Sequence, residues 1–233
     1  MRLLSHAKLI VLILIVSIAA RVSAVQDLVQ TSGSDPFDQR IALVELKNES
    51  IFEGIARLNQ VSGIAISLEG ILPAQGTIIN PTFRAKLEGH RIDEILSWFC
   101  SLDPRYTWSR DENMANIFPA VYRDDKTYVF NRVLPLLRFD GVSSSDDAAL
   151  DIFHQLGDPT ENIYFLGIGG TQTFAGPWTA NFREISVRHA LNQIARQLGP
   201  TYGWQIGGHI GSRLIMFHYK LGANTGYKPA PES

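Results

Sequence analysis

The feature that most constrains the fold is an apolar pattern that occurs twice in this chain of 233 residues, at an offset of 95 positions. It relates residues 83–102 to residues 178–197, and few of the matched residues are identical. A pattern repeated at a fixed offset predicts two copies of one supersecondary unit. The matched positions are Ala85 with Ala180, Leu87 with Phe182, Ile92 with Val187, Leu96 with Leu191 and Phe99 with Ile194, and, one residue further in the offset, Pro104 with Pro200, Tyr106 with Tyr202 and Trp108 with Trp204.

Each copy is predicted to run strand, helix, strand and then strand, helix, strand, strand. In the first copy, Ser50 and Glu53 form a capping-box signal at the start of a helix, and Gly63 is the stop signal at the end of that helix. In the second copy, the polar run at 143–147 caps a helix whose expected apolar face is Leu150, Phe153 and Leu156, with Gly157 at its end. The predicted strands lie at 41–46, 64–68, 105–109, 115–120, 133–139, 163–166, 201–206 and 213–217.

This order predicts an α+β fold of two tandem units, each a two-layer sandwich with its helices on one face of a sheet. The sequence leaves open whether the two units share one core. The expected divisions are a signal peptide at 1–24, a flexible lead at 25–38, the first repeat at 39–122, the second at 123–221 and a disordered tail at 222–233.

The first 24 residues have the three parts of a secretory signal peptide. Arg2 and Lys8 give a positive start, residues 9–20 are almost entirely apolar, and Val22-Ser23-Ala24 supplies small residues before a cleavage site expected after Ala24. An apolar run this short does not readily span a bilayer of about 30 Å. We therefore expect export to the periplasm or beyond the cell, with no membrane span after the signal is removed.

Charge and cysteine content narrow the class of protein further. Three of the 21 basic residues lie in the first 24 positions, so the remaining chain has 18 basic and 23 acidic side chains, a net charge of −5. An acidic balance disfavours nucleic acid as a partner. The only cysteine, Cys100, lies in an apolar helical run and is expected to be a buried, unreactive thiol, so a hydrophobic core must hold the fold together.

The first repeat resembles a known family. The segment Ile55-Ala-Arg-Leu-Asn-Gln-Val-Ser-Gly-Ile-Ala-Ile-Ser-Leu68 and the later Tyr106-Thr-Trp108 are similar to the short domain at the amino terminus of secretins and TonB-dependent receptors. The second repeat matches only in its later part, from Ala180 to Trp204. The resemblance implies a docking module without catalytic activity, here duplicated and apparently without a following barrel.

Candidate sites are few at this stage. The six histidines show no helical metal-ligand spacing. His209 and His218 could meet across a hairpin, but exposed or edge positions are the favoured interpretation for them. Gly167-Ile-Gly-Gly170 lacks the full phosphate-loop pattern, and helix starts account for Ser143–Asp147 and for Asp93-Glu94. We therefore expect no catalytic, cofactor or metal site. Trp178, which follows Gly176-Pro177, is the candidate contact residue for a partner.

The leading hypothesis is an exported, non-enzymatic interaction module of the cell envelope that binds a protein through exposed strand edges. The alternative is a periplasmic protein that binds a small ligand or glycan between the repeats, with residues 166–178 as a lid. A third hypothesis, an envelope hydrolase, requires a nucleophile, a base and an orienting group that the sequence does not nominate.

Overall fold

The computed structural model describes residues 35–70, 82–156, 172–207 and 214–219, with the side chains of the last strand and of residues 206 and 207 left out. The predicted signal peptide, the strand expected at 163–166, the glycine run at 167–170, and most of the predicted lead and tail lie outside these residues. Residues 36–38, at the end of the predicted lead, form a short 3-10 helix in which Phe37 is buried.

The first repeat contains two helices and seven short extended segments. Helix α2 begins after Ser50, whose hydroxyl and Glu53 make both hydrogen bonds of the predicted capping box, and it ends at Gly63, whose φ is 70°. In order, the elements are η1 (Pro36–Asp38), β1 (Arg40–Ile41), β2 (Val44–Ser50), α2 (Ile51–Ser62), β3 (Ala65–Glu69), β4 (Thr82–Leu87), β5 (His90–Arg91), α3 (Ile92–Leu102), β6 (Tyr106–Asp111) and β7 (Met114–Pro119), followed by η2 (Ala120–Tyr122) and η3 (Val129–Asn131).

The second repeat has the same order of elements among its described residues. It comprises β8 (Val133–Ser144), α4 (Ser145–Gln155), β9 (Thr173–Ser186), α5 (Val187–Leu198), β10 (Tyr202–Gly207) and β11 (Leu214–Tyr219). Ser144 caps α4 by accepting a hydrogen bond from the Asp147 amide at 3.2 Å. The positions before α3 and α5, Arg91 and Ser186, differ by 95, which is the sequence offset of the repeat. The chain is a mixed α+β protein.

Two details of the second repeat differ from the sequence-based expectation. Phe153 and Leu156 pack against the core as expected, but Leu150 is 37% exposed, because the fully buried stripe of α4 is formed by Ala148, Ala149 and Ile152. Strand β9 begins at Thr173, so residues 173–178 are part of a long strand and are not the loop that would have formed a lid. The strand continues through Gly176 and Pro177, which lie in an irregular stretch between Thr173 and Trp178, the residues that pair with Ser144 and Val142 of β8.

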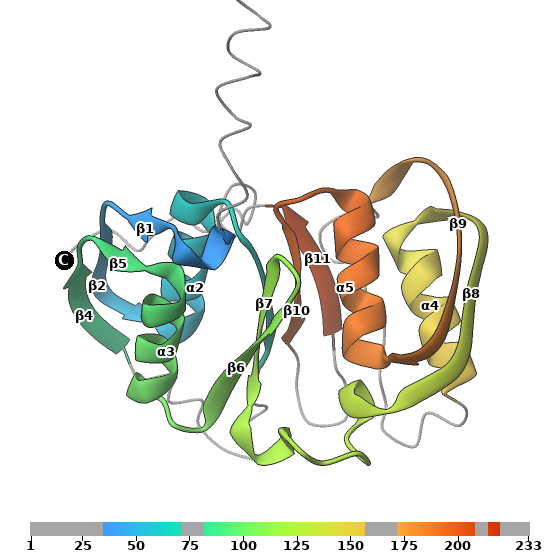
Figure 1. Ribbon diagram of the computed structural model, residues 1–233, viewed down its shortest axis with the longest axis horizontal. Coiled ribbons are helices and arrows are strands. Elements are labelled where there is room, and N and C mark those ends of the chain that lie inside the picture. Colours follow the sequence, from blue (N-terminus) through green and yellow to red (C-terminus); the bar gives the residue numbers. More distant parts are fainter. Residues whose placement is uncertain (1–34, 71–81, 157–171, 208–213, 220–233) are drawn as a thin grey trace, which may run out of the picture. The chain divides into compact units, whose positions relative to one another are not determined.

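A five-stranded sheet joins the two repeats, in the order β11-β10-β3-β7-β6 (Figure 1). Strands β10 and β3 come from different repeats and pair in parallel, with Gln205 opposite Leu68. Gly203 permits this junction, because a Cβ at that position would lie 2.0 Å from the carbonyl oxygen of Ile66. The remaining strands form three two-stranded ribbons, β1 with β5, β2 with β4 and β8 with β9.

The central strands of the shared sheet, β3 and β7, are buried on both faces. Strands β3 and β7 are buried at every position, and successive side chains of a strand point to opposite faces. Ile66 and Ile117 belong to an apolar cluster with α2 and α3, whereas Ala65 and Met114 belong to a second cluster with α4, α5 and Trp204. The repeats therefore have one sheet in common and a separate apolar cluster on each of its faces.

Candidate functional site

Helix α5 carries a polar stripe beside its apolar one. Its apolar residues Val187, Leu191 and Ile194 are buried in the core. The polar residues follow at spacings of three or four, which places them on one side of the helix. They are His189, Asn192, Gln193 and Arg196.

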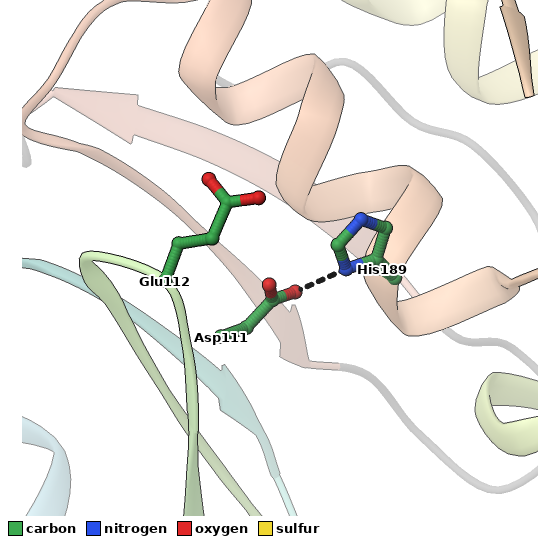
Figure 2. Close-up of side chains that lie close together, drawn as sticks. All are labelled: Asp111, Glu112 and His189. Atoms are coloured by element: carbon green, nitrogen blue, oxygen red, sulfur yellow. Dashed lines mark hydrogen bonds and ion pairs between the residues drawn. The ribbon is translucent and has the colours of Figure 1, made fainter.

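The stripe meets Asp111, the last residue of β6 in the first repeat (Figure 2). The Asp111 side chain is 15% exposed, and its carboxylate lies 2.7 Å from His189 Nδ1. It also accepts hydrogen bonds from Asn192 at 2.6 Å and from Arg196 at 2.9 Å. Arg196 donates a further bond, at 2.7 Å, to the backbone oxygen of Asp111. One carboxylate thus gathers three side chains of the other repeat.

These donors determine the ionisation of Asp111. Burial of the carboxyl group acts to raise its pKa, but the hydrogen bonds from His189, Asn192 and Arg196 outweigh burial and hold the pKa well below its usual range. An ionised carboxylate can only accept hydrogen bonds, so Nδ1 of His189 carries the proton. The group is a charged, multiply bonded anchor at the contact of the two repeats.

The network continues into the core through Asn192, which is fully buried. Its side-chain oxygen accepts a bond from Nε1 of Trp204 at 2.7 Å, and the hydroxyl of Ser67 lies 3.5 Å from the same oxygen. Asn192 therefore connects Asp111 to the strands β3 and β10 at which the repeats join. A buried polar group with all its partners rigidifies a single arrangement.

A second ion pair ties α5 to β3. Arg188 donates to the Glu69 carboxylate at 2.5 and 3.1 Å and to Asn131 Oδ1 at 2.5 Å. The Glu69 side chain is 2% exposed and that of Arg188 is 13% exposed. The guanidinium also lies 4.2 Å from the centre of the Phe118 ring. Both networks join residues far apart in sequence, which fits a role in fixing α5 on the shared sheet.

Asp111 and His189 have the geometry of the acid–imidazole pair found in many general bases. In such a pair Nε2 faces the hydroxyl or thiol that it deprotonates. Here Nε2 lies 2.9 Å from the side-chain nitrogen of Gln193, so its lone pair already accepts a hydrogen bond. Gln193 thus takes the place that a nucleophile would need.

Asp111, Glu112 and His189 offer ligand atoms that lie within 4.8 Å of one another. These atom types suit a divalent cation such as zinc. However, Nδ1 of His189 is already bonded to Asp111, and the positive Arg196 lies 2.9 Å from the same carboxylate. A cation there would have to displace the imidazole proton beside a fixed positive charge. The arrangement therefore suits a hydrogen-bonded contact between the two repeats better than a metal centre.

Two shallow hollows lie over the ribbons. One, of about 540 Å³, is lined by Val133, His189 and the β9 residues 181–186. The other, of about 360 Å³, is lined by residues 45–47 of β2 and 84–86 of β4. Both are surfaces beside two-stranded ribbons, where a partner could reach strand edges.

Trp178, the candidate contact residue, lies within β9 and is partly buried. Its ring stacks on Phe139, with ring centres 4.3 Å apart, and meets Phe174 edge-on at 5.5 Å. It packs against the core of the second repeat. A core-packing role accounts for this side chain, and its role in partner contact stays a prediction.

Other residues considered from the sequence have local roles. Asp93 and Glu94 lie in the first turn of α3, where the Glu94 carboxylate accepts a bond from the Arg91 amide at 2.9 Å. Burial raises the pKa of the Cys100 thiol to about 11, which keeps it protonated and unreactive. Trp204 is fully buried, and Trp98 and Trp108 are partly buried. His209 and the side chain of His218 lie outside the described residues.

The sequence alone does not indicate a site at Asp111, His189, Asn192 and Arg196. A signal was present, because three of them recur on α5 at helical spacing beside the apolar stripe. Their partner Asp111 lies 78 positions before His189, in a turn that looks ordinary. Nothing local indicates that the turn faces this helix.

Comparisons with family models, with curated proteins and with solved structures found no match to the chain. The resemblance to the short amino-terminal domain of secretins and TonB-dependent receptors therefore stays a prediction from the sequence pattern. Within the described residues, no helix is long and apolar enough to cross a membrane.

Proposed function

We propose that the chain is an exported, non-enzymatic docking module of the cell envelope that binds a protein partner along the ribbon of β8 and β9. The observation that carries this proposal is the length of that ribbon. Its strands have 12 and 14 residues, and among the described residues they pair only with each other. Each strand therefore presents a long edge whose backbone groups are open to a further strand.

The side chains of β8 support the same proposal. Val133 is 57% exposed and Leu136 is 39% exposed, although the residue that follows each of them, Leu134 and Leu137, is buried. Exposed aliphatic side chains on an unpaired strand edge favour association with another chain. Figure 1 places the ribbon on the far side of α4 and α5 from the shared sheet.

Ligand binding between the repeats receives less support. At the described part of their contact, Ala65, Met114 and Trp204 fill the space between sheet and helices, and Asn192 closes the polar edge. A hydrolase would require a nucleophile at Nε2 of His189, where Gln193 lies instead. Docking through strand edges requires neither a cavity nor a reactive group.

The test uses a matched pair of substitutions. Leu136→Lys places a charge on the edge of β8, and Leu150→Lys places the same charge on α4 at almost equal exposure, 39% against 37%. Each variant, as the full chain, is used to capture proteins from an envelope extract. We expect a partner that is retained by the wild type and by Leu150→Lys and lost with Leu136→Lys. A partner set that is unchanged by Leu136→Lys would count against docking on β8.

Export has its own test, because it rests on residues 1–24. Mass spectrometry of the chain recovered from the cell envelope should give an amino terminus at Val25, as expected for cleavage after Ala24. Recovery of uncleaved chain from the cytoplasmic fraction would contradict the proposed compartment.

A further inference from the structure

The outer face of the ribbon formed by β2 and β4 carries three cations, Lys47, Arg84 and Lys86, and one anion, Glu45. Along β2, Val44 and Leu46 are buried and Glu45 and Lys47 are exposed, so the charged residues share the outer face. On β4 the exposed residues are Thr82, Arg84 and Lys86. We call Lys47, Arg84 and Lys86 the basic face.

Two like charges lie directly opposite each other on this face. The register pairs Lys47 with Arg84, and like charges at such cross-strand positions destabilise a ribbon. Lys47 lies 3.7 Å from Glu45, but these side chains are 71% and 49% exposed, so their attraction is weak. Arg84 forms no ion pair with any described residue. An anion placed over the basic face would relieve this repulsion.

Strand β4 also has an open edge. Among the described residues it pairs only with β2. Figure 1 shows β4 as the outermost strand of the first repeat. Its two cations, Arg84 and Lys86, are two residues apart, so they recur about every 6.6–6.8 Å along one face. Lys86 lies opposite Glu45 in the register, and its ammonium lies 3.1 Å from the Glu88 carboxylate. The side chains of Lys86 and Glu88 are 62% and 68% exposed, so their attraction is weak and an acidic side chain of a partner can replace it.

An extended peptide has the same spacing of alternate side chains, so acidic residues at every second position would face Arg84 and Lys86 in register. The intervening side chains would lie near Phe83 and Ala85, which are partly buried and pack against the core of the first repeat. We infer that the free edge of β4 binds an extended segment of a partner protein in which acidic and apolar residues alternate. This inference rests on the proposed docking function and assigns it a second surface, distinct from β8.

The experiment measures binding of labelled seven-residue peptides to the full chain by fluorescence anisotropy. The test peptide is Thr-Glu-Val-Glu-Val-Glu-Thr. A peptide of the same composition with contiguous acids, Thr-Glu-Glu-Glu-Val-Val-Thr, controls for charge alone. Backbone amide protection, measured by NMR, locates the bound peptide.

Two double variants with the same change of net charge separate the two ribbons. Arg84→Glu with Lys86→Glu alters the basic face, and Arg138→Glu with Arg183→Glu alters exposed residues of β8 and β9. Thermal unfolding verifies that both variants are folded. We expect the first pair to weaken binding of the alternating peptide at least about tenfold, the second to change it less than about twofold, and the contiguous peptide to bind at least about fivefold more weakly.

Equal binding of the two peptides, equal effects of the two double variants, or amide protection outside residues 82–87 would each overturn the inference. Binding of a sulfated glycan to the basic face, with no binding of either peptide, would overturn it as well. None of these results bears on capture through Leu136 of β8, so failure here is distinguishable from failure of the docking function itself.

Discussion

Replacing Arg188 by methionine should destabilise the protein strongly, because it leaves a buried carboxylate without its cation. The Glu69 side chain is 2% exposed, and Arg188 donates to both of its oxygens. Methionine keeps much of the apolar length of the arginine side chain and so retains much of its packing near Phe118.

The magnitude follows from the burial of the pair. Removing one partner of a buried ion pair costs about 3–5 kcal/mol, since the remaining charge has lost its water and its partner. The whole fold is expected to be stable by only about 5–15 kcal/mol. For a domain of this size, each kcal/mol lowers the unfolding temperature by about 2–4 °C, so Arg188→Met should lower it by about 6–20 °C.

Replacing both partners should restore much of this loss. The double variant Glu69→Leu with Arg188→Met leaves no buried charge, and apolar replacements of buried ion pairs are often neutral or stabilising. Urea unfolding of the wild type, both single variants and the double variant gives the coupling energy. A cost below about 1 kcal/mol for Arg188→Met, or a double variant no more stable than that single variant, would refute the reasoning.

Three further substitutions test other contacts of the fold. Gly203→Ala should cost about 3 kcal/mol or more in urea unfolding, because its Cβ would lie 2.0 Å from the Ile66 carbonyl oxygen, and wild-type stability would show that the strands do not approach so closely. Asp111→Asn should be less stable than the wild type above about pH 4, as measured by urea unfolding. Because folding lowers the pKa of Asp111, the carboxylate contributes its full stabilisation above its unfolded pKa of about 3.9 and loses it as the pH falls through the folded pKa. The stability difference between variant and wild type should therefore shrink in acid, and a difference that grows in acid would contradict this. Glu184→Gly should raise stability by about 0.5 kcal/mol in thermal unfolding, because Glu184 has a φ of 51° where the first repeat has Gly89 at 70°, and a loss of stability would mean that the glutamate side chain makes a contact that outweighs the strain.

Much of the secondary structure could be predicted because its signals are local. The capping box of Ser50 with Glu53, the stop at Gly63 and the cap at Ser144 each depend on residues within a few positions, and all three are confirmed. The apolar spacing also gave the α+β class and the positions of most strands. The expectation of a loop up to Trp178 was wrong, since Gly176 and Pro177 resemble a loop, whereas β9 runs through them with Thr173 and Trp178 paired to β8 on either side.

The candidate site could not be predicted, because its members are brought together by packing. The hydrogen bond between His189 and Asp111 joins residues 78 positions apart, and that between Arg188 and Glu69 joins residues 119 positions apart. A polar stripe on a helix indicates that something polar faces it, but it does not identify the partner. That partner depends on how the strands are ordered.

The sequence by itself determined two copies of one pattern of helices and strands, since propensity, capping and apolar period act within each segment. Only the tertiary structure decided that β10 of the second copy pairs with β3 of the first, that Gly203 allows this close approach, and that β4, β8 and β9 each pair with a single strand among the described residues. The physical reason is that backbone pairing is nearly independent of residue type. Which strands become neighbours is decided by the burial of whole faces, and no single segment carries that information.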